Sequence, residues 1–221
     1  GAGIYWEAEV DTLRAIADLE TTFQEITGEA SVNWDAAKHL PPYFRSKFHA
    51  YSEGNLCWEA ALEALVASKA VGVRNFPEFG KEGENHMRSL HDAAMIRMGA
   101  YVPQGATIVD LGCGTGTSTR RLAALFPQAL KVIGLDLSPH FLTVAKRVPE
   151  IALLGSHELA ASERVEVQMA DITDTKLPAG SASLVSVCLV IHELPSERTA
   201  AVFREALRLL APGGSMVIME M

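Results

Sequence analysis

The sequence of 221 residues predicts an α/β fold with a doubly wound, mostly parallel sheet behind an all-helical N-terminal segment. From residue 107 onward, apolar stretches of strand length alternate with amphipathic stretches of helix length. A glycine-rich turn joins the first of these strands to the first helix. The first hundred residues contain helical patterns and no alternating strand pattern. We therefore predict a helical cap over residues 1–100 and an α/β core over residues 101–221.

In the cap, apolar residues at helical spacing predict a helix over 7–27 that ends near Gly28. Residues 55–71 give the strongest helical pattern of the chain. Weaker patterns are found elsewhere in the cap, at 33–40, 43–50 and 82–99. Pro41-Pro42 and Pro77 separate these segments, because proline interrupts helices.

The first core strand, residues 107–111, leads into the sequence VDLGCGTG at 109–116. Its glycines stand at alternate positions, and a helix-like stretch, STRRLAALF, follows. Glycine tolerates positive φ and lets a ligand approach the bare backbone, so this turn is typical of a nucleotide-cofactor site.

The spacing of the glycines bears on the kind of cofactor. A dinucleotide fingerprint reads G-x-G-x-x-G, and here Thr117 stands where its third glycine would be. Asp110, two residues before the first glycine, would repel a pyrophosphate but suits a cationic amino group. S-adenosylmethionine (SAM) has such an amino group and no phosphate, so the pattern D-x-G-x-G-x-G favours SAM. Glycine spacing alone is a weak discriminator, and at this point NAD, FAD and a turn without a ligand remain alternatives.

Two further strands end at carboxylates. The second, 131–136, ends at Asp136, and an acidic residue at this position holds a ribose diol in SAM and NAD enzymes alike. Ser138, with Pro139 after it, is the better helix N-cap, so Asp136 is not needed for capping. The third strand, 165–170, alternates and stops at Asp171-Ile172.

The last two strands flank an amphipathic helix. The fourth, 182–188, is apolar throughout, which is typical of a parallel sheet covered on both faces. It leads through His192-Glu193-Leu194-Pro195 into the helix SERTAAVFREALRLL. That helix ends at the turn APGG, and residues 215–220 form the predicted fifth strand.

Four of these segments, in this order along 107–221, resemble the class I SAM-dependent methyltransferases: the glycine turn, Asp136, Asp171-Ile172 and the LLAPGG turn with its strand. The resemblance implies a Rossmann-like sheet of strand order 3-2-1-4-5. In the family the sheet continues with strands 7 and 6, so the C-terminal strands 6 and 7 are expected to be missing here and the natural chain to be longer. Residues 41–77 are similar to the lead-in of some plant and algal methyltransferases.

Carried over position by position, the resemblance implies a set of SAM contacts. Asp110 would anchor the amino group of the methionine moiety, often through water, and Asp136 would hold the ribose. Asp171 would accept from the adenine amino group. The backbone N–H of Ile172 would meet the edge of the adenine, and Leu137 would pack near that ring. Leu189 would lie under the methionine arm. The backbone of the glycine turn would line the cleft through Gly112, Cys113, Gly114 and Gly116.

The implied reaction transfers the methyl group of SAM to a nucleophile and leaves S-adenosylhomocysteine (SAH). Because the donor is already activated, such a transfer depends mostly on positioning. His192 is the candidate catalytic base, since it follows the fourth strand directly. The alternative is that His192 and Glu193 shape the loop or cover SAM. Tyr43 and Tyr51 of the cap are either SAM contacts or packing residues.

Composition limits the partners and the compartment. The formal net charge of −8 makes the chain a poor partner for phosphate backbones, so a nucleic-acid substrate is not expected. No apolar run reaches the ~18 residues of a membrane span, which predicts a soluble enzyme. The three cysteines lie far apart without metal-type spacing, so we expect reduced thiols, no metal site and a reducing compartment. With the resemblance of residues 41–77 to plant and algal methyltransferases, this compartment is expected to be the cytoplasm or the plastid stroma. Arg120 and Arg121, in the helix after the glycine turn, are expected to be solvated.

The sequence thus predicts a SAM-dependent methyltransferase that acts on a small molecule or a protein side chain. The alternative is a catalytically silent subunit that retains the SAM fold as a binding component of a larger complex. The methyl acceptor is not predicted.

Overall fold

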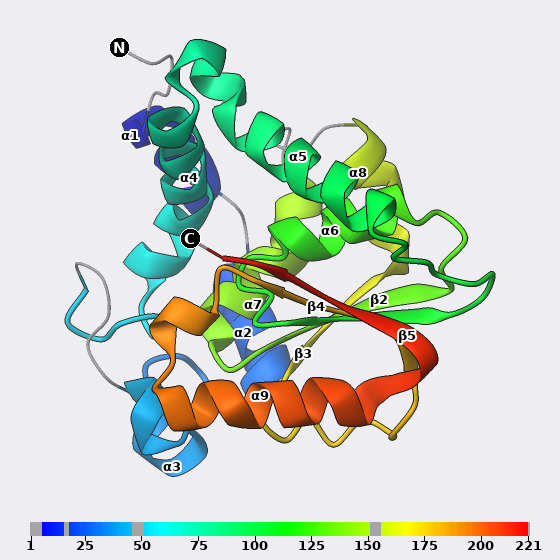
Figure 1. Cartoon of the computed structure of the whole chain (residues 1–221). Coiled ribbons are helices and arrows are strands. Elements are labelled where there is room, and N and C mark those ends of the chain that lie inside the picture. The colour runs from blue at the N-terminus through cyan, green and yellow to red at the C-terminus, as the bar shows by residue number, and fades with distance from the viewer. Residues whose placement is uncertain (1–5, 16–17, 46–50, 151–155, 221) are drawn as a thin grey trace.

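The computed structural model describes residues 6–15, 18–45, 51–150 and 156–220. At its centre lies a five-stranded parallel sheet of order β3-β2-β1-β4-β5 (Figure 1), which confirms the predicted order. The strands are Thr107–Leu111 (β1), Lys131–Asp136 (β2), Val165–Met169 (β3), Ala182–Cys188 (β4) and Leu210–Met219 (β5).

The fifth strand begins earlier than the predicted start at residue 215. Leu210 already pairs with Ala182, and an irregularity then shifts the register so that Ser215 pairs with Leu184. The turn sequence APGG is therefore part of the edge strand. Proline is tolerated at such an edge, since a ladder partner on its outer side is not required.

Both faces of the sheet are buried because alternate residues of each strand point to opposite sides. Val109 of β1 and Val185 of β4 belong to a cluster with α9 (Ser196–Leu209). Ile108 and Leu184, their neighbours in the strands, belong to a second cluster with α6 (Thr117–Leu125). In Figure 1 these two helices lie on opposite sides of the sheet. The fold is therefore doubly wound, as predicted. The remaining core helices are α7 (Pro139–Arg147) and α8 (Ser156–Ala161).

The N-terminal segment is helical in its described parts. Its α-helices are α1 (Trp6–Arg14), α2 (Leu19–Thr27), α3 (Ala36–His39), α4 (Trp58–Asn75) and α5 (Gly83–Arg97), with 3₁₀ turns at Pro42–Arg45 and Pro77–Glu82. The prediction of one helix over 7–27 was wrong, because Asp18 has a φ of 60° and starts a second helix. The predicted helix over 43–50 lies partly outside the described residues.

The cap packs directly on the core. Val10 of α1 and Val66 of α4 share a buried cluster with Val144 of α7. Met95 of α5 belongs to the cluster that contains Ile108 of β1. These clusters cross residue 100, and the proposed division into two domains at that position stays a prediction.

Helices α4 and α5 cross at a very close backbone contact. A Cβ atom on Gly72 would lie 2.1 Å from the backbone nitrogen of Glu84, and one on Gly83 would lie 2.5 Å from the carbonyl oxygen of Gly72. Only glycine fits at these two positions. The contact fixes the angle at which α5 returns over the sheet, and with it the position of Arg88 on α5.

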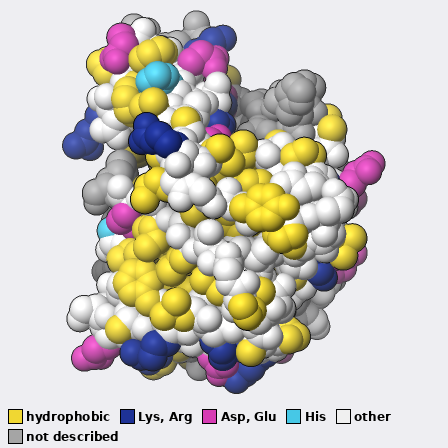
Figure 2. All heavy atoms as spheres, turned by 45° about the vertical axis from the view of Figure 1, so that its right-hand side comes forward, with side chains coloured by type: hydrophobic (Ala, Val, Ile, Leu, Met, Phe, Trp, Pro, Cys, Tyr) yellow, Lys and Arg dark blue, Asp and Glu magenta, His cyan; other side chains and the backbone are white. Residues whose placement is uncertain are grey.

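The edge formed by β5 has no further strand among the described residues. Ile218 of β5 is 43 % exposed, and Figure 2 shows hydrophobic side chains spread over this side of the molecule. None of the helices in the described part of the chain is long and apolar enough to cross a membrane.

Candidate functional site

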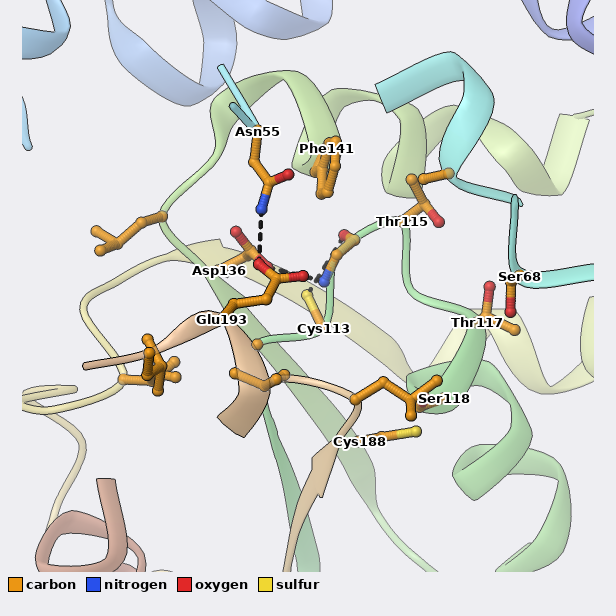
Figure 3. Close-up of a pocket in the computed structure, with 18 of the residues that line it drawn as sticks. Asn55, Ser68, Cys113, Thr115, Thr117, Ser118, Asp136, Phe141, Cys188 and Glu193 are labelled. Carbon is orange, nitrogen blue, oxygen red and sulfur yellow. Dashed lines mark hydrogen bonds between the residues drawn. The ribbon is translucent and has the colours of Figure 1, made fainter. Parts of the chain in front are cut away.

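A pocket opens at the carboxyl ends of the strands, between the tips of β1, β2 and β4. Strand order reverses between β1 and β4, and ligands of open α/β sheets bind at such a switch point. The empty space measures about 1190 Å³, part of it open to solvent. Core and cap both line it, and Figure 3 shows Asn55 and Ser68 on the side of the cap. Tyr43 of the cap also belongs to the lining.

The glycine turn forms the floor of the pocket. The backbone N–H groups of Gly112 and Cys113 both donate to the carbonyl oxygen of Leu135 on β2, at 2.8 and 2.9 Å. Gly112 has a φ of 75°, and a Cβ atom there would lie 2.5 Å from Cγ2 of Val190. A side chain at this position would therefore collide with the wall formed by the segment after β4. Gly112, Cys113 and Gly114 line the pocket, as predicted.

Gly116 lies just outside the lining, at the N-cap of α6 with a φ of 79°. A Cβ atom there would lie 2.8 Å from Nη1 of Arg120. Arg120 is 1 % exposed and donates to the carbonyl oxygens of Thr115 (2.7 Å) and Ala145 (3.3 Å). The expectation that Arg120 and Arg121 are solvated was wrong. Arg120 holds the glycine turn in place through its bond to Thr115. Arg121 forms an ion pair with Asp92 of α5, in which Nε lies 2.7 Å from Oδ2.

Asp110 lies behind the turn and not among the lining residues. Its side chain is fully buried, and Oδ2 accepts from the Thr119 hydroxyl at 2.7 Å. Burial raises the pKa of this carboxyl group, and the hydrogen bond from Thr119 lowers it in part. The contact with the SAM amino group, direct or through water, stays a prediction.

Asp136 stands at the tip of β2 and lines the pocket. Its Oδ2 accepts from the Gly114 N–H at 2.9 Å and its Oδ1 from the Ser138 N–H at 2.8 Å. Burial raises the pKa of Asp136, while these backbone donors lower it. Each carboxylate oxygen can accept more than one hydrogen bond, so the anchored group still offers acceptor sites to a ligand. Ser138 caps α7, as predicted, by accepting from the Phe141 N–H at 3.1 Å.

Asp171 also lies outside the lining, whereas the adjacent Ile172 is part of it. Oδ1 of Asp171 accepts from the N–H and hydroxyl of Thr173 and, at 3.0 Å, from the Tyr43 hydroxyl. Burial and the neighbouring Asp171 raise the pKa of Tyr43. Tyr43 thus joins the cap to the tip of β3 and lines the pocket, while Tyr51 donates to Glu63 and is not among the lining residues.

The segment after β4 forms one wall. Leu189 lines the pocket with a φ of 56°, an uncommon conformation for a residue other than glycine and one that occurs at functional sites. His192 is not among the lining residues. Its Nδ1 lies 2.7 Å from Oε1 of Glu220, and its side chain is 37 % exposed. The structure therefore turns His192 toward Glu220, and its role as a base stays a prediction.

Glu193 and Asn55 make a contact that the sequence did not reveal (Figure 3). Nδ2 of Asn55 donates to Oε2 of Glu193 at 2.9 Å, and the carbonyl oxygen of Asn55 accepts from the Ser138 hydroxyl at 2.6 Å. Asn55 therefore bridges the tips of β2 and β4. Burial is the main cause that raises the pKa of Glu193 to about 7. The sequence named His192 and Glu193 together as residues that could cover SAM, and of the two only Glu193 lines the pocket.

Arg88 of α5 is another lining residue that sequence patterns missed. It is 7 % exposed, and its Nε donates to Oε1 of Glu84 at 2.9 Å. Its terminal nitrogens donate to the hydroxyls of Ser118 (3.2 Å) and Ser68 (3.1 Å). Glu and Arg four residues apart on a helix are usually an exposed pair, so the sequence alone gave no reason to place Arg88 in a pocket.

The charges of the described lining residues favour a cationic ligand without phosphate. Asp136 and Glu193 are acidic, and the buried cation Arg88 is already paired with Glu84. Gly112 and Gly114 line the pocket with backbone alone, which a ligand can approach closely. SAM has a positively charged sulfur, an adenosine and no phosphate, so the residues present fit SAM and do not fit a pyrophosphate.

Residues 108–214 match the family model described as "Methyltransferase domain". This stretch holds the glycine turn, both strand-tip carboxylates and the wall after β4. Residues 108–214 are a class I methyltransferase domain. The Rossmann-like fold and the cofactor SAM, both of which the sequence indicated, are thereby confirmed.

Curated relatives match the same domain. A trans-aconitate 2-methyltransferase from Azoarcus sp. (strain BH72) is 36 % identical over 121 residues, which are 54 % of this chain and 41 % of that protein. A demethylmenaquinone methyltransferase from Clavibacter sepedonicus is 34 % identical over 116 residues, 52 % of this chain and 41 % of its own length. The chain thus spans less than half the length of these two relatives.

A solved structure agrees with the fold of the methyltransferase domain. The crystal structure of a candidate SAM-dependent methyltransferase from Methanococcus maripaludis superposes with a TM-score of 0.54 at 18 % identity. The match covers 79 % of this chain and 68 % of that one. At this identity the likeness concerns the fold.

Proposed function

We propose that this chain transfers the methyl group of SAM to a small-molecule acceptor. The observation that supports this most is the acidic pocket at the switch point, in which the glycine turn and Asp136 lie together. When bound, SAM supplies a methyl group already activated on sulfur. What the chain must do is bind the donor, orient it and exclude water.

Each of these tasks has residues in the pocket. Asp136 is held in place by two backbone N–H groups and offers its oxygens to the ribose. The backbone of Gly112 and Gly114 leaves room for the methionine arm, with Leu189 beneath it. Leu137 packs near the adenine, and the backbone N–H of Ile172 meets its edge. The predicted contacts of Asp110, Gly116 and Asp171 would act from just behind this lining.

The acceptor would enter on the side of the cap. Phe44, Ala64 and Ser68 line the pocket there and come from the part of the chain outside the matched domain. The named acceptors of the two relatives, trans-aconitate and demethylmenaquinone, are small molecules, which supports the same class here. Three free cysteines fit a reducing compartment, either cytoplasm or plastid stroma.

Calorimetric titration with SAM, SAH and NADH tests the proposal. We expect SAM and SAH to bind and NADH not to bind. Asp136→Asn should weaken SAM by about 10- to 100-fold, because hydrogen bonds to a charged group contribute about 1.5–3 kcal/mol. Asp174→Asn is the matched control, since Asp174 is an exposed carboxylate outside the pocket. Failure of both SAM and SAH to bind the folded protein would refute the proposal.

A further inference from the structure

The two acidic side chains of the pocket are held in different ways. Asp136 accepts from two backbone N–H groups, and such donors favour its charged form. Glu193 accepts from the neutral side-chain amide of Asn55. The carboxyl group of Glu193 is therefore the one whose charge depends most on what else occupies the pocket.

Several groups act on Glu193 from the surrounding elements. Burial and the negative charges of Asp136 on β2 and Glu220 after β5 favour its neutral form. Asn55 of the cap and His192 of the same turn favour its charged form. The balance puts the pKa of Glu193 at about 7, so that both forms are populated near neutral pH. A single additional charge in the pocket can decide which form prevails.

SAM and SAH differ by one methyl group and one positive charge on sulfur. A cation in the pocket is attracted by a charged Glu193 and gains little from a neutral one. A neutral thioether has no such preference. We propose that Glu193 distinguishes the donor from the product by charge: it releases its proton to solvent when SAM binds and regains a proton once the sulfur is neutral. This inference rests on the proposed function of the pocket as a SAM site.

The proposal gives the pocket a way to bind the donor more tightly than the product. While SAM is bound, the charged Glu193 balances the sulfonium. After the methyl group has left, the electron pair of the broken bond remains on sulfur, and a charged Glu193 would stand next to Asp136 without a cation. Uptake of a proton from solvent or from the acceptor removes this repulsion. SAH is then held without the attraction between the sulfonium and Glu193 and dissociates more readily.

The test is calorimetry of SAM and SAH binding in buffers of different ionisation enthalpy, which counts protons exchanged with the solvent. If the sulfonium lowers the pKa of Glu193 by about one unit, SAM releases about half a proton at pH 6.5 and binds about fivefold more tightly at pH 8 than at pH 6. SAH should release less and show a flatter dependence. Titration of the ligand's own amino group is common to all protein variants and cancels when they are compared.

Two variants and a control isolate Glu193. Glu193→Gln should abolish the additional proton release with SAM and bring the SAM-to-SAH affinity ratio to a value that does not change with pH. Asn55→Ala keeps the carboxyl group but removes a hydrogen bond that favours its charge, so the midpoint of the pH dependence should move upward. Glu197→Gln, at an exposed position in the first turn of α9, should behave as the wild type.

The outcomes separate this inference from the proposed function. Equal proton release with SAM and SAH in the wild type, or release that persists in Glu193→Gln, would overturn the inference and leave the SAM site intact. If Glu193→Gln does not fold, Asn55→Ala decides the matter, because an unchanged midpoint of the pH dependence in that variant would overturn the inference. Failure of both ligands to bind would overturn the proposed function and the inference with it.

Discussion

Replacement of Gly112 by alanine tests the close approach between the glycine turn and the segment after β4. The substitution acts in two ways. It places an L side chain at a φ of 75°, and it puts a Cβ atom 2.5 Å from Cγ2 and 3.0 Å from Cγ1 of Val190. The first effect is backbone strain, and the second is overpacking against a wall of the pocket.

The two effects have separate magnitudes. A left-handed conformation costs an L residue about 1–2 kcal/mol, and overpacking in a packed site costs about 1–3 kcal/mol. Gly105 isolates the first effect, because its φ is 76° and a Cβ atom there would meet nothing within 4 Å. We expect Gly105→Ala to cost about 1–2 kcal/mol and Gly112→Ala to cost about 1–3 kcal/mol more.

The assay is denaturant and thermal unfolding of both variants, followed by SAM titration. The additional cost of Gly112→Ala should lower its Tm by about 2–4 °C per kcal/mol relative to Gly105→Ala. Its SAM affinity should also fall, since Val190 adjoins Leu189 in the pocket wall. Val190→Ala in the Gly112→Ala background removes both methyl groups in conflict and should recover most of the difference. Equal losses in the two glycine variants would refute the argument.

Three further predictions concern other contacts. His140 is buried among aromatic rings with its pKa lowered to about 4; the unfolded chain binds its proton below about pH 6.5. The free energy of unfolding should therefore fall as the pH drops from 6.5 to 4, and at pH 5 this loss should be about 2 kcal/mol. Urea titrations of His140→Phe should not show this pH-dependent loss. Arg120→Met leaves two carbonyl oxygens without their donor and should lower the free energy of unfolding by about 2–4 kcal/mol in denaturant titrations. Arg121→Met, the control, should lower it by about 1 kcal/mol. Equal losses would contradict the view that Arg120 holds the glycine turn in place. Tyr43→Phe removes the bond to Asp171 and should cost about 0.5–1.5 kcal/mol in the same assay, and an unchanged stability would count against that link between cap and core.

The core could be predicted from sequence because its signals are local. The bounds of β1, β2 and β4 agree with the prediction. Each strand is a short, mostly apolar run, and β1 and β2 end at clear local signals, a glycine turn and a carboxylate. The start of β5 was missed for the opposite reason. Leu210 joins the sheet by pairing with Ala182, and no local pattern in the turn sequence APGG reports such a partner.

Apart from Tyr43, the cap side of the site could not be predicted, because its partners come from distant parts of the chain. Asn55 lies 138 positions from Glu193, and Arg88 lies 30 positions from Ser118. Each residue taken by itself has an ordinary local role, as a loop amide or as half of a helical ion pair. Arg120 was misjudged in the same way, because the helical pattern gave no sign that its guanidinium turns under the glycine turn.

The site is therefore composed of two parts with different origins. The donor side belongs to the matched methyltransferase domain, while Tyr43, Asn55 and Arg88 reach it from outside residues 108–214. Their hydrogen bonds end on Asp171, Glu193 and Ser118, so the position of the cap and the shape of the donor site depend on each other. A relative that shares the domain but not the cap would bind the same donor in a pocket with a different second wall. We therefore expect substitutions in the cap to change acceptor preference while the affinity for SAH is largely kept, except at Asn55, where the charge of Glu193 is also affected.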